Sequence, residues 1–197
     1  RFDIISDYLA AMKQVIDKHE KITYIGIQGL TNLANLLKKY PEVIPKLEVY
    51  QMGGAIDFEL RPGWVEHNIA LDVESARYVL ESGVDISLVG AQTTFNPNLV
   101  VGNNHRIYRK LLESTDPVYQ DLVTHIKLYN KAKGYWPRMH DPLTVAAALG
   151  DFVDFYESGI VIDKEGKMSL GDGSIKISNP KSQDKEFMNF LYKRMFN

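Results

Sequence analysis

Two short apolar segments, Ile22-Thr-Tyr-Ile-Gly-Ile27 and Leu47-Glu-Val-Tyr-Gln-Met52, flank the segment Leu30-Thr-Asn-Leu-Ala-Asn-Leu-Leu-Lys-Lys39. The two outer segments are rich in β-branched and aromatic residues, which is typical of buried strands. In the middle segment leucine and alanine recur at spacings of three and four residues, which predicts an amphipathic helix. Pro41 forbids the continuation of that helix. The order strand, helix, strand predicts two parallel strands joined by a helical crossover.

The alternation of helix and strand continues beyond this unit. Residues 72–82 read as a helix, and residues 85–90 read as a third strand. The pattern indicates an α/β fold, with an open, mostly parallel sheet and helices on both faces. In such sheets ligands bind beyond the carboxyl ends of the strands. We therefore expect functional residues in the loops after Ile27, Met52 and Val89.

The segments on either side of this unit are mainly helical. At the start, the apolar spacing from Ser6 onward predicts a helix that Ser6 or Asp7 caps. Near the end, Lys164-Glu165-Gly166 reads as the turn of a small C-terminal hairpin, and residues 174–178 are a candidate third strand of a meander. The remaining predicted elements are helices over 105–113 and 117–132, a capped helix start at Asp141-Pro142, hairpin strands over 160–163 and 167–170, and a closing helix over 184–196.

The composition of the 197 residues is that of a globular domain and excludes several classes of function. Charges nearly balance, with 23 Lys and Arg against 25 Asp and Glu, which argues against a nucleic-acid binder. The absence of cysteine excludes disulfides, thiolate metal sites and thiol nucleophiles. No apolar run has the length of a membrane span, and the start has no signal pattern. We expect a single cytoplasmic domain over residues 1–197 that binds neither nucleic acid nor membrane.

His140 and Asp141 lie side by side at a predicted helix start, within Met139-His-Asp-Pro-Leu143. An aspartate cap followed by proline is a common way to begin a helix, and the residues alone favour this structural role. The same pair could also carry chemistry. The carboxylate could ligate a hard cation such as Ca²⁺ or Mg²⁺, and the imidazole could give a proton to a leaving group.

Glu66 and Asn68 follow the predicted strand end at Gly53-Gly54. In an extended segment, side chains two residues apart point to the same side. A carboxylate beside an amide can hold vicinal hydroxyls, because each hydroxyl both donates and accepts a hydrogen bond. Solvated loop residues and an ordinary glycine turn are the simpler interpretation, and the residues alone favour it.

The segment Gly26-Ile-Gln-Gly-Leu-Thr-Asn32 connects the first predicted strand to its helix, where free backbone groups could meet an ion. Its glycines lack the spacing of the common nucleotide-binding loops, so phosphate binding is not favoured. His19, His105 and His125 fall within predicted helices, and we expect them to be packing or surface residues.

Four motifs occur in this order: Gly29-Leu-Thr-Asn-Leu-Ala34, Met52-Gly-Gly-Ala55, Glu66-His-Asn-Ile69 with Asp72-Val-Glu-Ser-Ala76 after it, and Met139-His-Asp-Pro-Leu143. Together they resemble the inosine-uridine preferring nucleoside hydrolase family. The resemblance runs across essentially the whole chain, including the closing hairpin and helix. Several short motifs in the correct order are far more specific than any one of them alone.

The resemblance implies hydrolysis of the N-glycosidic bond of a ribonucleoside to free base and ribose. It also implies a Ca²⁺ that holds a water molecule and the 2′- and 3′-hydroxyls of the ribose, and a homodimer or homotetramer. The residues that match functional positions of the family are His140 as the acid for the leaving base, Asp141 and the carbonyl of Ile27 as calcium ligands, and Met52, Glu66 and Asn68 around the ribose.

The chain departs from the family pattern in two places. Leu60 stands where the family has an asparagine that contacts the ribose, and Trp64 follows closely. The aspartate-rich opening motif of the family, which supplies most metal ligands and the carboxylate that activates water, is absent from the 197 residues. Asp3 and Asp7 come too late in the fold to replace it. Since this motif is absent and the chain opens at Arg1 without Met, we expect a domain that lacks its N-terminal βαβ unit. Because most metal ligands are missing, we expect it to bind Ca²⁺ weakly and to turn over little substrate.

Two classes of function therefore compete. The leading hypothesis is part of a longer nucleoside hydrolase, and the alternative is an inactive truncated homologue that acts as a nucleoside-binding or interaction module. A metal-dependent phosphoryl-transfer enzyme is a third, less favoured possibility, because no phosphate-binding loop is present. The base preference stays open, since Tyr129, Tyr135 and Trp136 could stack on any base, although packing is the commoner role of such residues.

Overall fold

The computed structural model describes residues 7–197. Asp3 and Ser6 lie outside the described residues, and Asp7 caps the first helix by accepting a hydrogen bond from the amide of Ala10. The elements in chain order are α1 (Tyr8–Asp17), β1 (Ile22–Gly26), α2 (Thr31–Lys39), η1 (Pro41–Lys46), β2 (Leu47–Met52), α3 (His67–Ala70), α4 (Val73–Glu81), β3 (Asp85–Val89), α5 (Ala91–Thr94), η2 (Pro97–Leu99), α6 (Arg106–Glu113), α7 (Pro117–Lys133), α8 (His140–Ala148), β4 (Phe155–Ile162), β5 (Met168–Ser178) and α9 (Asp184–Phe196).

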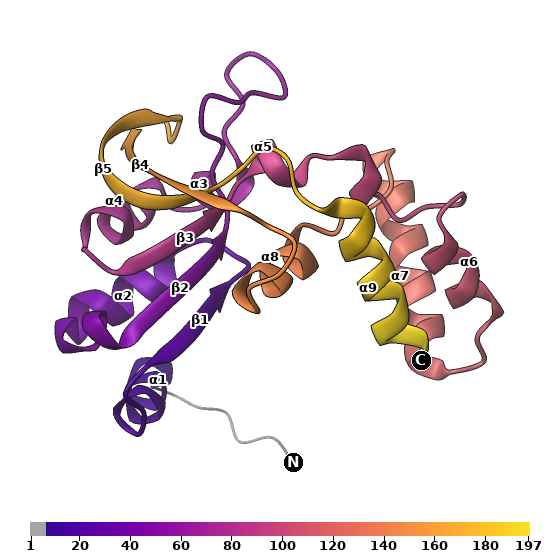
Figure 1. Cartoon of the computed structure of the whole chain (residues 1–197), viewed down its shortest axis with the longest axis horizontal. Helices are drawn as coiled ribbons and strands as arrows, with labels where there is room; N and C mark the ends of the chain where they lie inside the picture. Colours follow the sequence, from indigo (N-terminus) through magenta and orange to yellow (C-terminus); the bar gives the residue numbers. More distant parts are fainter. Residues whose placement is uncertain (1–6) are drawn as a thin grey trace.

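A five-stranded sheet organises the described chain, with the strand order β1-β2-β3-β5-β4. β1, β2 and β3 are parallel neighbours, with Ile22 opposite Leu47 and Glu48 opposite Asp85. β5 pairs parallel with β3, and β4 pairs antiparallel with β5. Figure 1 shows α2 and α4 on one side of the sheet and α8 on the other. The predicted α/β fold with a mostly parallel sheet and flanking helices is confirmed.

The C-terminal hairpin is larger than predicted. Its two strands are β4 and β5, joined by the predicted turn at residues 163–167. The expected third strand over 174–178 is wrong, because these residues continue β5 and pair with both β3 and β4. A register shift after Ser158 absorbs the bend of the long strand. At Gly159 a Cβ would come within 2.0 Å of the Asp172 backbone, so a side chain cannot fit there.

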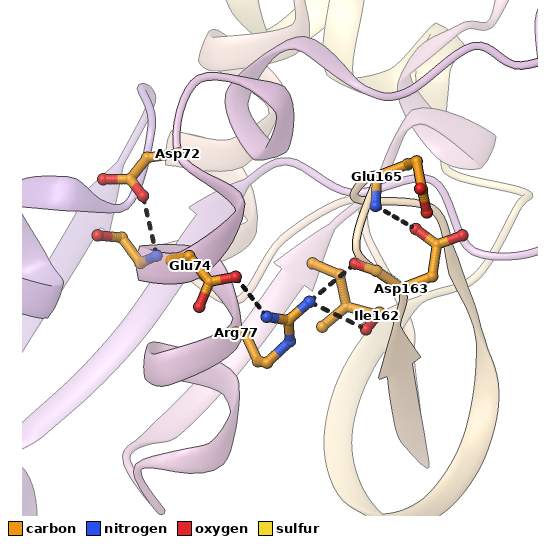
Figure 2. Close-up of polar contacts among 7 residues, drawn as sticks. Asp72, Glu74, Arg77, Ile162, Asp163 and Glu165 are labelled. Carbon is orange, nitrogen blue, oxygen red and sulfur yellow. Dashed lines mark hydrogen bonds and ion pairs between the residues drawn. The ribbon is translucent and has the colours of Figure 1, made fainter.

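Arg77 ties the hairpin turn to α4, as Figure 2 shows. Its guanidinium contacts Glu74 at 2.6 Å and donates to the carbonyl of Asp163 at 2.9 Å. The Asp163 carboxylate in turn accepts from the amides of Glu165 and Lys167, at 3.0 and 2.8 Å. A single arginine thereby holds the turn against a helix far away in the sequence.

The buried apolar side chains form two clusters. One lies between the sheet and the helices α2 and α4, and includes Leu36, Leu88 and Ile177. The other lies among α6, α7, α8 and α9, and includes Leu143 and Phe187. In Figure 1 the helices α6, α7 and α9 stand to one side of the sheet, with α8 between them and the strands. α8 therefore connects the sheet to the helical cluster.

Two of the histidines predicted inside helices lie at helix ends instead. His19 follows the end of α1. His105 is the N-cap of α6, and its Nδ1 accepts a hydrogen bond from the amide of Ile107 at 3.2 Å. Among the described residues no helix is both long and apolar enough to cross a membrane.

We predict that Leu88→Ala lowers the free energy of unfolding by about 2–5 kcal/mol, because it leaves a cavity in the sheet core. Leu88 lies on the central strand β3 and is fully buried. Leu170→Ala is the matched control, since Leu170 is 47% exposed on β5, and we expect a change within about 0.5 kcal/mol. Urea unfolding of both variants measures the difference, and equal losses would contradict the assignment of the core.

Candidate active site

The predicted site residues gather near the carboxyl ends of the parallel strands. Ile27 follows β1, Met52 ends β2, and α5 begins just after β3. α8, which carries His140 and Asp141, contacts both β2 and β1. Figure 1 shows α8 beside the ends of these strands. The location expected from the sheet topology is therefore the place where the chain brings its candidate residues together.

Glu66 does not stand in an extended segment with Asn68, as the spacing suggested. It is the N-cap of the short helix α3, and Asn68 lies inside that helix. The prediction of an extended segment fails because one carboxylate oxygen, Oε2, accepts the amide hydrogens of Asn68 and Ile69 at 3.0 and 3.2 Å, which starts a helical turn. The same oxygen accepts the amide of Gly54 at 3.1 Å. Glu66 thus joins α3 to the end of β2.

The Glu66 side chain is almost completely buried, with 5% of its surface exposed. Burial raises the pKa of its carboxyl group, and the hydrogen bonds from the Asn68, Gly54 and Ile69 amides oppose that rise only in part. The second carboxylate oxygen, Oε1, makes no hydrogen bond with any residue in the described part of the chain, so it remains available to a ligand.

Asn68 and Met52 are in direct contact. The Nδ2 group of Asn68 donates to the carbonyl of Met52 at 3.0 Å and lies 3.2 Å from its sulfur. Both residues are buried. Because the amide nitrogen of Asn68 is used in this way, its carbonyl oxygen is the group left to accept a hydrogen bond from a ligand. The structure brings Met52, Glu66 and Asn68 together at the end of β2.

Backbone conformation favours the glycine pair after β2, and at Gly54 close approach adds to it. Gly54 has a φ of +83°, and a Cβ there would lie 2.9 Å from the sulfur of Met168. A Cβ on Gly53 would lie 3.4 Å from Oε2 of Glu66. Gly54 therefore needs both its positive φ and its missing side chain, whereas at Gly53 the φ of +157° is what favours glycine.

Gln51 is a positioning residue that the sequence analysis did not single out. Its Nε2 donates to the carbonyls of Gln28 and Met52, each at 2.7 Å, and the residue is fully buried. These bonds connect the loop after β1 to the end of β2. A Cβ on Gly26 would lie 1.9 Å from Oε1 of Gln51, so Gly26 makes room for it. In the sequence, the only sign of this role is a glutamine inside a predicted strand.

His140 begins α8, but Asp141 does not cap it, which corrects the prediction. The N-cap is Met139, whose carbonyl accepts the amide of Leu143 at 3.2 Å, and no side chain caps this end. Asp141 lies inside the first turn, where its negative charge is favourable near the helix N-terminus. Burial raises the pKa of the Asp141 carboxyl group. The carboxylate is therefore not used as a cap.

The His140 ring packs on Phe95, with 5.0 Å between the ring centroids. Its Nδ1 is buried and has no hydrogen-bond partner among the described residues. Burial, helped by the nearby charge of Arg138, lowers the pKa of His140 to about 4. The ring is therefore neutral at pH 7, and it can donate a hydrogen bond from one nitrogen and accept at the other.

Aromatic side chains connect His140 to the loop before α3. Phe95 also packs on Trp64 at 5.6 Å and on Phe58 at 6.2 Å, and Phe58 contacts Trp64. A cavity of about 510 Å³ lies between this loop and the hairpin turn, and Glu66 is the one predicted site residue that lines it. Trp64 also lines this cavity.

Three aromatic residues named from the sequence as possible stacking groups have partners of their own. Tyr129 and Tyr135 pack edge to face at 5.7 Å. Trp136 packs on Tyr108 at 5.4 Å and adjoins the second apolar cluster.

The described residues do not provide a calcium site. They contain no group of three or more His, Asp, Glu or Cys side chains that could hold a metal ion. Calcium takes six to eight oxygen ligands, and one carboxylate with one carbonyl falls far short of that number. Asp141 and the carbonyl of Ile27 therefore do not fit Ca²⁺ on their own, and no chemical step can be assigned to the ion from these residues.

The fold and the site define an α/β protein whose ligand position follows the carboxyl ends of parallel strands. The profile of the inosine-uridine preferring nucleoside hydrolase family matches residues 5–188. The chain belongs to this family.

Curated relatives agree with this assignment, and a solved structure shares the fold. A "Probable ribonucleoside hydrolase" of Dictyostelium discoideum is 31% identical over 138 residues, which cover 64% of this chain and 39% of that protein. The pyrimidine-specific ribonucleoside hydrolase RihA of Escherichia coli is 26% identical over 164 residues, covering 81% and 52% of the two chains. A purine-preferring ribonucleoside hydrolase from Gardnerella vaginalis has a TM-score of 0.84 at 20% identity, over 99% of this chain and 67% of the other. The chain spans about half the length, or less, of these curated relatives.

We predict that the buried carboxyl group of Glu66 makes stability fall as pH rises. Because its folded pKa is raised, the folded state binds more protons than the unfolded state between the two pKa values. The stabilisation is complete below the ordinary pKa of glutamate and is lost as pH rises through the raised value. Glu66→Gln removes the titrating group, so its unfolding free energy should change less over this window.

Urea unfolding at a series of pH values measures this effect. Glu81→Gln, at an exposed position at the end of α4, is the control and should keep the pH dependence of the unsubstituted chain. If Glu66→Gln follows the same curve as the unsubstituted chain, the raised pKa of Glu66 is refuted.

Proposed function

We propose that this chain forms the ribose-binding and base-facing side of a ribonucleoside hydrolase. The observation that carries the proposal is the buried cluster of Met52, Glu66 and Asn68 at the end of β2. It leaves one carboxylate oxygen and one amide oxygen to accept hydrogen bonds from vicinal hydroxyls. Membership of the nucleoside hydrolase family and the names of the relatives support the same substrate class.

In the proposed reaction, water attacks the anomeric carbon of the ribose while the bond to the base breaks. The electrons of that bond leave with the base, and the sugar carries positive charge in the transition state. The attacking water loses one proton and the base gains one, which leaves ribose and the free base. Glu66 and Asn68 orient the ribose and place negative and dipolar groups near the developing positive charge. His140, neutral at pH 7, donates a hydrogen bond to the departing base rather than carrying a charge.

The proposal includes Ca²⁺, but the described residues supply only part of its ligands. Asp141 and the carbonyl of Ile27 are the proposed ligands of this chain, and the other oxygen ligands have to come from outside the described residues. We assign no step of the reaction to the ion. A homodimer or homotetramer in the cytoplasm is the proposed setting.

A second candidate function is a nucleoside-binding or interaction module without catalysis. The lack of an acidic metal-binding group in the described chain favours it. Both candidates share the ribose contacts, and they differ in turnover. The proposal leaves the base preference open, because one relative is named pyrimidine-specific and one solved structure is named purine-preferring.

We predict that Asn68→Ala weakens the binding of uridine by about tenfold, which corresponds to the loss of one hydrogen bond in a buried site. Isothermal titration calorimetry with uridine and 2′-deoxyuridine measures both the affinity and the recognition of the hydroxyl. Asn103→Ala, at an exposed position before α6, is the matched control. Unchanged uridine affinity in Asn68→Ala would remove this residue from the ribose site.

We predict that the purified 197-residue chain hydrolyses inosine and uridine little or not at all, and that added Ca²⁺ changes this only slightly. The physical reason is the small number of oxygen ligands that the described residues offer. Absorbance assays with and without Ca²⁺ measure the turnover. Rapid turnover by this chain would show that a complete catalytic centre is present, and would also contradict the module without catalysis.

A further inference from the structure

Arg138 is a cation in neutral surroundings. It lies in the segment before α8, where the backbone is fixed because the amides of Val101 and Met139 donate to the carbonyls of Pro137 and Leu99, both at 2.9 Å. The guanidinium lies 4.9 Å from the centre of the Phe95 ring. Within the described chain it forms no ion pair, and its Nε is buried without a hydrogen-bond partner. Its charge therefore lacks a counterion.

The groups nearest to Arg138 do not supply that counterion. His140 packs on the same Phe95 ring, and an imidazole supplies no negative charge. Burial and the neighbouring Tyr135 raise the pKa of Tyr129 to about 12, although Arg138 opposes the rise, so this phenol is also neutral. Asp141, the carboxylate closest to Arg138 in the chain, does not supply it either, because no ion pair joins the two side chains within the described residues.

Unpartnered polar atoms concentrate around Phe95. Among the described residues, three buried side-chain atoms have no hydrogen-bond partner: Thr94 Oγ1, Arg138 Nε and His140 Nδ1. Arg138 and His140 both contact Phe95, and Thr94 precedes it in the chain. Buried polar groups without partners are costly, and such groups in a folded protein call for a ligand or another partner.

We propose that Arg138, with His140 beside it, forms a binding position for the negative charge of an ionised heterocyclic base. This inference rests on the proposed function, which places the base next to His140. The aromatic groups around Arg138 suit a planar ligand, and the unpaired guanidinium suits oxygen or nitrogen atoms that share a negative charge. When the glycosidic bond breaks, its electron pair stays with the base, so the arginine stabilises the leaving group electrostatically.

The test compares the binding of two free bases to the 197-residue chain at one pH near neutrality. The bases are 5-nitrouracil, which is largely ionised there, and uracil, which is neutral. We expect 5-nitrouracil to bind at least about tenfold more tightly than uracil by isothermal titration calorimetry, as a charged hydrogen bond allows. Arg138→Gln removes the positive charge and should reduce this ratio to below about threefold.

Two further variants test whether the effect of Arg138→Gln comes from the lost charge or from a change in structure. Arg138→Lys keeps the charge and should keep part of the preference for the ionised base. Arg109→Gln removes an exposed arginine on α6 and should behave like the unsubstituted chain. Circular dichroism checks that each variant is folded.

The possible outcomes separate this inference from the proposed function. Equal affinities for the two bases, or a preference that survives Arg138→Gln, overturn the inference. A second experiment measures competition between inorganic phosphate and 5-nitrouracil. If phosphate displaces 5-nitrouracil and Arg138→Gln abolishes this effect, the anion position is supported, with a free anion rather than a base as its occupant. If neither uracil nor uridine binds while the anions bind through Arg138, the anion position stands and the proposed function fails. If no anion binds, the inference is wrong, whatever the result for uridine.

Discussion

The parallel pairing of β1, β2 and β3 is the constraint on which the site depends, because it brings three strand ends to one edge of the sheet. Backbone bonds continue this order past the strands. The amide of Gly53 donates to the carbonyl of Val89 at 3.3 Å, and the amide of Ala91 donates to the carbonyl of Gly54 at 2.7 Å. The glycine pair is thereby held between two strand ends, where it can receive the Glu66 carboxylate. Without this alignment, α3 would have no fixed position relative to β2.

Glu66 is a buried acidic residue whose burial is costly. A buried carboxylate is unfavourable, and its raised pKa shows that three amide hydrogen bonds offset the cost of burial only in part. An apolar residue would pack into the same place more favourably, but it could not hold Gly54 and α3 while leaving an oxygen for a ligand. A hydrogen bond from the ligand in the proposed ribose site explains why a carboxylate is kept here at this cost.

The two sides of the candidate site have opposite electrostatic character. Glu66 and Asn68 offer oxygen atoms on one side, and Arg138 and His140 offer a cation and a neutral imidazole on the other. Cleavage of an N-glycosidic bond places positive charge on the sugar and negative charge on the base. The proposed assignment of ribose to the first side and base to the second therefore matches charge to charge.

The sequence by itself determined the α/β class, the three parallel strands and the residues near their ends, because buried strands, crossover helices and prolines leave local patterns. Gln51, the cap at Met139 and the course of β5 from one sheet neighbour to the next were decided only by the tertiary structure. The same is true of Glu66, which the residues alone suggested to be a solvated loop residue and which is a buried carboxylate on three amides. It is also true of Arg138, which no sequence pattern marked and which lies on Phe95 without an ion pair in the described chain. Burial and hydrogen-bond partners depend on segments far apart in the chain, and no local pattern contains them.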